Sequence, residues 1–115
     1  MKIEIRATSI ELSKTLRDYV RRRVRSVLGR FSPSIDRVRV TLAYWHGPRG
    51  GLDRRCTVQV YQAGVEPVVA EHTHEHVHGA IVHAVRRAER AMARRRDRAA
   101  WSGTWGRREA LYQAA

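Results

Sequence analysis

Two hydrophobic periods alternate along the chain, and their order constrains the fold more than any other feature. A period of two, typical of a strand with one buried face, runs through residues 2–7, 37–44 and 55–61. Residues 67–73 predict a fourth strand, which begins with Pro67. Because proline cannot donate a backbone hydrogen bond, we expect this strand at an edge of the sheet, or with a late start.

Two further segments repeat their apolar residues at helical spacing. The first follows Ser13, whose hydroxyl can accept a bond from the first turn, and Gly29 and Pro33 are expected to end it. The second runs from about Glu75 to Arg98. The resulting order is β-α-β-β-β-α, which predicts an α+β fold: a four-stranded sheet with two helices packed on one face.

Residues 1–98 are therefore interpreted as one domain and residues 99–115 as a C-terminal tail of different character. Neither a repeat nor a linker interrupts the chain before residue 99. The tail contains Trp101 and Trp105 in a polar, glycine-containing setting. Two explanations stay open: the tryptophans fold back onto the domain, or they contact a ligand, an RNA or a second subunit.

Positive charge dominates the composition. The 115 residues include 23 lysines and arginines against 11 acidic residues, a formal net charge of +12, and only Lys2 and Lys14 are lysines. Such an excess attracts polyanions, and guanidinium groups can bind phosphates through two parallel hydrogen bonds. Nucleic acid is therefore the expected partner.

Several classes of protein are excluded by simple features. The single cysteine, Cys56, cannot form an internal disulfide. No stretch approaches the roughly 20 apolar residues of a membrane span, and residues 1–6 lack the apolar segment of a signal peptide. We therefore expect a cytoplasmic protein without a membrane partner.

Catalysis finds little support in the sequence. Cys56 alternates with valines and is interpreted as a buried core residue rather than a nucleophile. A phosphate-cradling glycine loop and a spaced carboxylate pair are both missing. We expect no enzyme activity, no cofactor and no small-molecule substrate.

The arginines concentrate on the two predicted helices. Seven lie in residues 86–98, opposed only by Glu89 and Asp97, and five lie in residues 21–30. A helix face that is merely solvated usually mixes its charges. Here like charges repel one another, and contact with a phosphate backbone would offset that repulsion. Two basic helices side by side on a sheet suit shape recognition of folded RNA better than the reading of bases.

A histidine cluster gives the main competing interpretation. Residues 71–78 read EHTHEHVH, which places imidazoles at His72, His74, His76 and His78. Imidazole is a common ligand of zinc, copper and nickel. A metal-binding or sensing protein with these four ligands is therefore an alternative. His83, seven residues after His76, could share a helix face with it.

Several short motifs follow one another in a specific order. They are KIEI at 2–5, LSKTLRDYV at 12–20, RF at 30–31, VRVTL at 38–42, VVAE at 68–71, and AI with AV at 80–81 and 84–85. Their order and spacing, over about residues 1–98, resemble the ribosome hibernation-promoting factors and ribosome-associated inhibitors, also called the sigma-54 modulation family, in its short form.

The resemblance implies a non-enzymatic factor that binds the small ribosomal subunit and its 16S rRNA. In that family the domain occupies the mRNA and tRNA channel at the decoding centre, blocks the A and P sites, and silences ribosomes under stress. The contacts come largely from basic helix residues, which correspond here to Arg17, Arg21, Arg22, Arg25, Arg86, Arg87, Arg90 and Arg94. A protein that binds other structured RNA or DNA is the remaining alternative.

The chain departs from the resembled pattern at its histidines. The family often opens its last helix with Asp-x-Tyr-Ala-Ala-Ile-Asp, whereas residues 76–82 read HVHGAIV here. Protonation of clustered histidines near about pH 6.5 would add positive charge beside RNA. Metal binding and pH sensing by these histidines therefore remain alternative functions.

Overall fold

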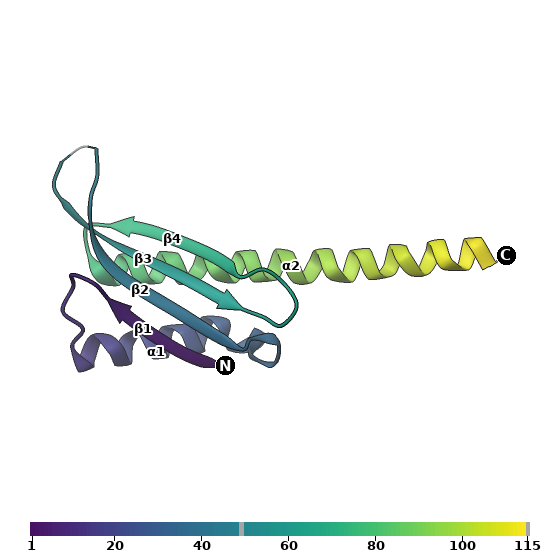
Figure 1. Cartoon of the computed structure of the whole chain (residues 1–115), viewed down its shortest axis with the longest axis horizontal. Coiled ribbons are helices and arrows are strands. Elements are labelled where there is room, and N and C mark those ends of the chain that lie inside the picture. The colour runs from purple at the N-terminus through teal and green to yellow at the C-terminus, as the bar shows by residue number, and fades with distance from the viewer. Residues whose placement is uncertain (49, 115) are drawn as a thin grey trace.

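The computed structural model describes the backbone of residues 1–48 and 50–114 and the side chains of residues 1–48 and 50–100. Its elements follow the predicted order, with a short 3-10 helix added after the first α-helix (Figure 1). In chain order they are β1 (Lys2–Ala7), α1 (Lys14–Leu28), the 3-10 helix η1 (Gly29–Ser34), β2 (Arg37–His46), β3 (Leu52–Tyr61), β4 (Val68–His74) and α2 (Val77–Ala114).

The four strands form one sheet in the order β1-β2-β3-β4. β1 runs parallel to β2, with Ile3 opposite Val38, whereas β2–β3 and β3–β4 are antiparallel. A parallel pair needs a crossover connection, and α1 supplies it. Both helices lie on the same face of the sheet, with α2 against β3 and β4 (Figure 1). The predicted α+β fold is confirmed, as is the edge position of the fourth strand.

The core lies between the sheet and the two helices. The period of two in the strands is confirmed, because alternate residues of β2 and β3 are fully buried. Helix α1 contributes every fourth residue, and α2 contributes alanines that allow it to approach the sheet closely. The fully buried residues are Val20, Val24, Leu28, Val38, Val40, Leu42, Cys56, Val58, Val60, Ala80, Ile81, Ala84, Val85 and Ala88.

Helix α1 begins after Ser13 and ends before Gly29, as predicted, but the chain stays wound beyond its end. The Oγ of Ser13 accepts a hydrogen bond from the backbone N–H of Leu16 at 3.1 Å, which confirms the predicted cap. Gly29, expected as a stop, has a right-handed backbone with φ of −58°, and the chain continues as η1. Phe31 is buried within η1, and the Oγ of Ser34 donates to the carbonyl of Phe31 at 2.9 Å. Burial of this ring keeps the chain wound up to Ser34.

Helix α2 starts at Val77 and continues to Ala114, past its predicted end at Arg98. Residues 99–114 contain no proline, and their four alanines, with residues 107–111 (RREAL), favour a helix. The side chains of Trp101 and Trp105 lie outside the described residues, so both explanations for them stay predictions. The division into a domain of residues 1–98 and a tail of residues 99–115 likewise stays a prediction.

Candidate nucleic-acid interface

Three of the predicted arginines on α2 form a row beside the edge strand. Their spacing of three and four residues places them on one flank of the helix. The Nη1 of Arg87 donates to the backbone carbonyl of Glu71 at 2.9 Å, which anchors the row to β4. Together they line a shallow hollow, here called the β4–α2 cleft, whose residues are Val69, Ala70, Glu71, Arg87, Arg90, Ala91 and Arg94.

A second group of predicted arginines lies on α1. Arg21, Arg22 and Arg25 line another shallow depression, together with Thr15 and Asp18. Arg17 on α1 and Arg86 on α2 are exposed and lie outside both hollows. The two hollows share no lining residue. The two helices therefore present two separate basic patches, one of which continues onto the edge of the sheet.

The eight predicted arginines lack acidic partners. All eight are exposed, and among the residues whose side chains are described no carboxylate lies within 4.0 Å of any of them. On the sheet face away from the helices, Arg37 and Arg39 instead contact Glu4, and Arg55 contacts Glu71. The hydrogen bond from Arg39 lowers the pKa of Glu4. Glu4 and Glu71 thus pair with arginines of the sheet rather than with the eight arginines of the helices.

Other arginines of the basic segments serve the fold. The Nη1 of Arg95 donates to Oε1 of Gln62 at 2.8 Å. The guanidinium carbons of Arg96 and Arg30 lie 4.3 and 4.5 Å from the ring centroid of Phe31. The contact of Arg96 holds η1 against α2, whereas Arg30 belongs to η1 itself. Sequence reasoning could not separate Arg95 and Arg96 from the others, because their partners lie far away along the chain.

The predicted histidines divide between two places. His72 and His74 on β4 meet His83 on α2, whose ring centroid lies 4.6 Å from that of His72 and 5.9 Å from that of His74. His76 lies beside His74, whose Nδ1 accepts the backbone N–H of His76 at 2.9 Å. His78 instead packs against Tyr19 of α1, with a centroid separation of 4.5 Å. The four candidate ligands are therefore not brought together, and His83 joins two of them.

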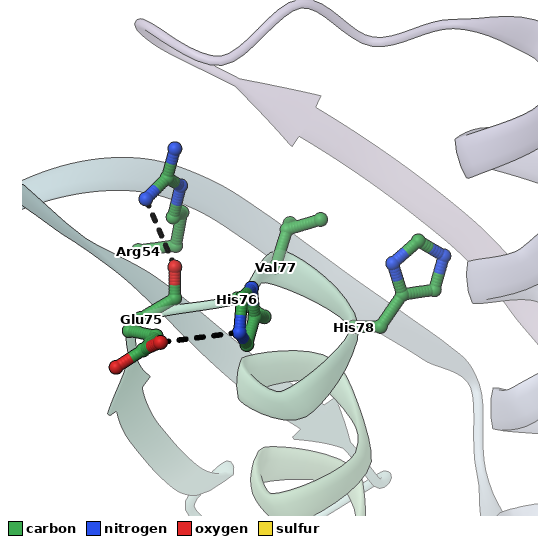
Figure 2. A pocket seen from close by; sticks show the side chains of 5 residues that line it. All are labelled: Arg54, Glu75, His76, Val77 and His78. Atoms are coloured by element: carbon green, nitrogen blue, oxygen red, sulfur yellow. Dashed lines mark hydrogen bonds and ion pairs between the residues drawn. The ribbon is translucent and has the colours of Figure 1, made fainter.

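Figure 2 shows the start of α2, where His76 and His78 point in different directions. Glu75 forms an ion pair with His76 at 3.2 Å, and the Nη1 of Arg54 donates to the carbonyl of Glu75 at 2.9 Å. Arg54 was not predicted as part of any site, because a bond to a distant backbone carbonyl leaves no signal in the sequence. Within residues 1–48 and 50–100, no three His, Cys, Asp or Glu side chains are placed to hold a metal ion.

Cys56 lies in the core, as predicted. It is fully buried on β3, and burial raises the pKa of its thiol to about 12. The group therefore stays protonated at neutral pH, which is unsuitable for a nucleophile. Separately, no helix in the described part of the chain combines the length and apolar character needed to span a membrane.

Comparison with known families identifies the family of this chain. The sequence model of the family described as sigma 54 modulation protein / S30EA ribosomal protein matches residues 3–100. The match takes in all four strands, both hollows and the histidines of β4 and α2. The chain belongs to this family. The resemblance carried by the short motifs is thereby confirmed, and it places the S30EA-family protein among ribosome-associated factors.

Two solved structures share the fold of this S30EA-family protein. The N-terminal domain of Protein Y from Thermus thermophilus is 24% identical, with a TM-score of 0.66 over 82% of this chain and 98% of that one. A ribosomal subunit interface protein from Coxiella burnetii is 11% identical, with a TM-score of 0.71 over 84% and 99% of the two chains. At these identities the likeness concerns the fold alone. No curated protein matches the chain.

Proposed function

We propose that this S30EA-family protein binds the small ribosomal subunit through 16S rRNA in the decoding channel. There it blocks the A and P sites to tRNA and mRNA and acts as a cytoplasmic hibernation factor under stress. Membership of the S30EA family supports a ribosomal partner. The basic patches of the two helices support contact with RNA.

One observation carries the proposal: the eight exposed arginines of α1 and α2 have no carboxylate within 4.0 Å among the described side chains. Unpaired like charges on neighbouring turns repel one another. A phosphate backbone removes that repulsion and releases its own condensed counterions on contact. Binding to RNA is therefore favoured by the same charges that are unfavourable in the free protein.

The proposed mechanism is steric. Guanidinium groups anchor the folded domain on rRNA phosphates, and the volume of the domain then excludes mRNA and tRNA. No covalent bond is made or broken, so the mechanism requires neither a catalytic group nor a cofactor.

The β4–α2 cleft provides the sharpest test. We expect the variant Arg87→Gln/Arg90→Gln/Arg94→Gln to bind small subunits at least about tenfold more weakly, because each lost phosphate contact removes counterion release. The salt slope, d log K/d log[salt], should shrink by about 2 to 3. Co-sedimentation with purified 30S subunits at several salt concentrations measures both quantities.

A control removes the same charge from the other face of the sheet. The variant Arg37→Gln/Arg39→Gln/Arg55→Gln loses three positive charges from arginines that contact Glu4 or Glu71, and we expect a much smaller loss of affinity. Equal losses in the two variants would show that net charge alone directs binding.

Competition by initiator tRNA with mRNA, but not by duplex RNA, is expected for the decoding channel. Competition by every polyanion would indicate a general RNA- or DNA-binding protein instead.

A further inference from the structure

The row of arginines in the β4–α2 cleft continues into a histidine. His83 precedes Arg87 by four residues, Arg90 by seven and Arg94 by eleven, so all four lie on one flank of α2. His83 is therefore one turn closer to the start of the helix than the first arginine of the cleft. At that end the row presents an imidazole in place of a guanidinium.

Two imidazoles from β4 join His83 to form what is here called the histidine cluster. His72 and His74 lie two residues apart on the strand and share one face. Their ring centroids are 6.2 Å apart, and each is within 6 Å of the ring centroid of His83. The cluster thus occupies the same β4–α2 junction as the cleft, immediately beyond Arg87.

The histidine cluster has no acidic partner. Among the described side chains, no carboxylate lies within 4.0 Å of His72, His74 or His83. Burial lowers the pKa of His72, and the neighbouring charges of His83, Arg87 and His74 lower it further. The titratable and charged groups on the packed elements are Arg54 and Cys56 on β3, Glu71 on β4, Glu75 and His76 in the turn, and Arg86 and Arg87 on α2.

We propose that the histidine cluster is a proton-dependent extension of the β4–α2 cleft, so that an RNA phosphodiester backbone lying along the cleft binds more tightly as pH falls below neutral. The inference rests on the proposed function, because it requires the cleft to contact phosphates. It adds a regulation that the arginines cannot provide, since guanidinium groups keep their charge at every physiological pH.

The sign of the effect follows from linkage. In the free protein, burial and the neighbouring cations lower the pKa of His72 and so disfavour its protonation. A phosphate group beside the imidazoles supplies the missing negative charge and accepts a charge-assisted hydrogen bond from a protonated ring. The complex therefore binds more protons than the free protein, and affinity must rise as pH falls. Uptake of a single proton limits the rise to about tenfold per pH unit.

The test uses the full chain and a labelled oligouridine strand, whose bases do not titrate between the two pH values chosen. Affinity is measured at pH 6.0 and 7.5 at constant salt, with EDTA in both buffers. We expect binding about fivefold tighter at pH 6.0, within the limit set by uptake of one proton. His83→Gln should shrink this ratio, and His72→Gln/His83→Gln should bring it close to one. Circular dichroism checks folding at both pH values.

The control is His46→Gln, which removes an exposed imidazole at the hairpin end of β2, a strand that β3 separates from β4. This variant should keep the full ratio. If the His72→Gln change impairs folding, the single variant His83→Gln provides the test, because the side chain of His83 is exposed. A pH-independent affinity, or a ratio unchanged in His83→Gln, would overturn the inference. So would a ratio that appears only when EDTA is replaced by zinc, because that result indicates a metal site.

The two proposals fail separately. A flat pH profile leaves preferential binding to small subunits at pH 7.5 intact and overturns only the role of the cluster. A histidine-dependent rise on oligouridine, combined with no preference for small subunits, supports the cluster and overturns the ribosomal function.

Discussion

At the scale of single residues, Gly79 determines where the ring of His74 can lie. A Cβ built at Gly79 would lie 2.5 Å from both Nδ1 and Cε1 of His74. That Nδ1 accepts the backbone N–H of His76 at 2.9 Å and so closes the turn between β4 and α2. A glycine in the first turn of the helix therefore makes room for the bond that joins strand to helix.

Gly79→Ala should lower stability although alanine is the better helix former. We expect the free energy of unfolding to fall by about 1 kcal/mol, because displacement of the His74 ring and loss of its hydrogen bond outweigh the gain in helix propensity. Gly29→Ala is the matched control, because a Cβ there meets nothing within 4 Å. It should gain about 0.5 to 1 kcal/mol. Urea unfolding measures both, and equal gains would contradict the role assigned to Gly79.

Residues that act locally were predictable, and residues that meet across the fold were not. The cap of Ser13 and the burial of Cys56 follow from their immediate neighbours in the sequence. The alternative site at His72, His74, His76 and His78 stays a prediction, but α2 begins at Val77 and His78 lies beside Tyr19, away from His72. The packing of α2 against the sheet decides which of its residues contacts β4. No local pattern in the sequence contains that information.

At the scale of elements, η1 shows how tertiary packing overrides a local stop. Gly29 and Pro33 predict an end to α1, and the regular α-helix does end at Leu28. The chain stays wound because Phe31, only 2% exposed, is inserted into the core. Arg96 of α2 contacts its ring and so fixes η1 against α2. The amphipathic pattern of α1 was predictable, whereas this anchor depends on a residue 65 positions away from Phe31.

Phe31→Ala tests the anchor. We expect a loss of about 3 to 5 kcal/mol in the free energy of unfolding, since a buried aromatic ring is replaced by a cavity. Phe31→Leu keeps most of the apolar volume and should cost clearly less. Chemical denaturation of the two variants gives the comparison. A loss below about 1 kcal/mol in Phe31→Ala would show that η1 is held by its backbone alone.

At the scale of the whole molecule, the net charge of +12 acts on folding and on binding in opposite directions. The fold and its basic helices were predictable, because periodicity and charge are distributed along the sequence. Their division into two hollows was not, because residues 21–25 and 87–94 carry similar patterns yet line two hollows that share no residue. Self-repulsion in the free protein is thus spread over both helices.

Salt should therefore stabilise the free protein and weaken its complex. Raising sodium chloride from about 50 to 300 mM shortens the Debye length and screens the repulsion among arginines, so the Tm should rise. The same change should lower affinity for small subunits by at least about tenfold, because counterion release is lost. Thermal unfolding and co-sedimentation in matched buffers provide the two measurements. A Tm that falls with salt would mean that ion pairs, rather than repulsion, dominate the free molecule.

The hydrogen bond from Arg87 to the carbonyl of Glu71 also affects how copies of the protein meet. An uncovered edge strand can recruit a strand from another molecule and so begin aggregation. On β4 that carbonyl is already occupied, and Arg90 and Arg94 lie beside it in the same cleft. A second copy approaching this edge would meet a row of like charges, which disfavours pairing of another strand with β4.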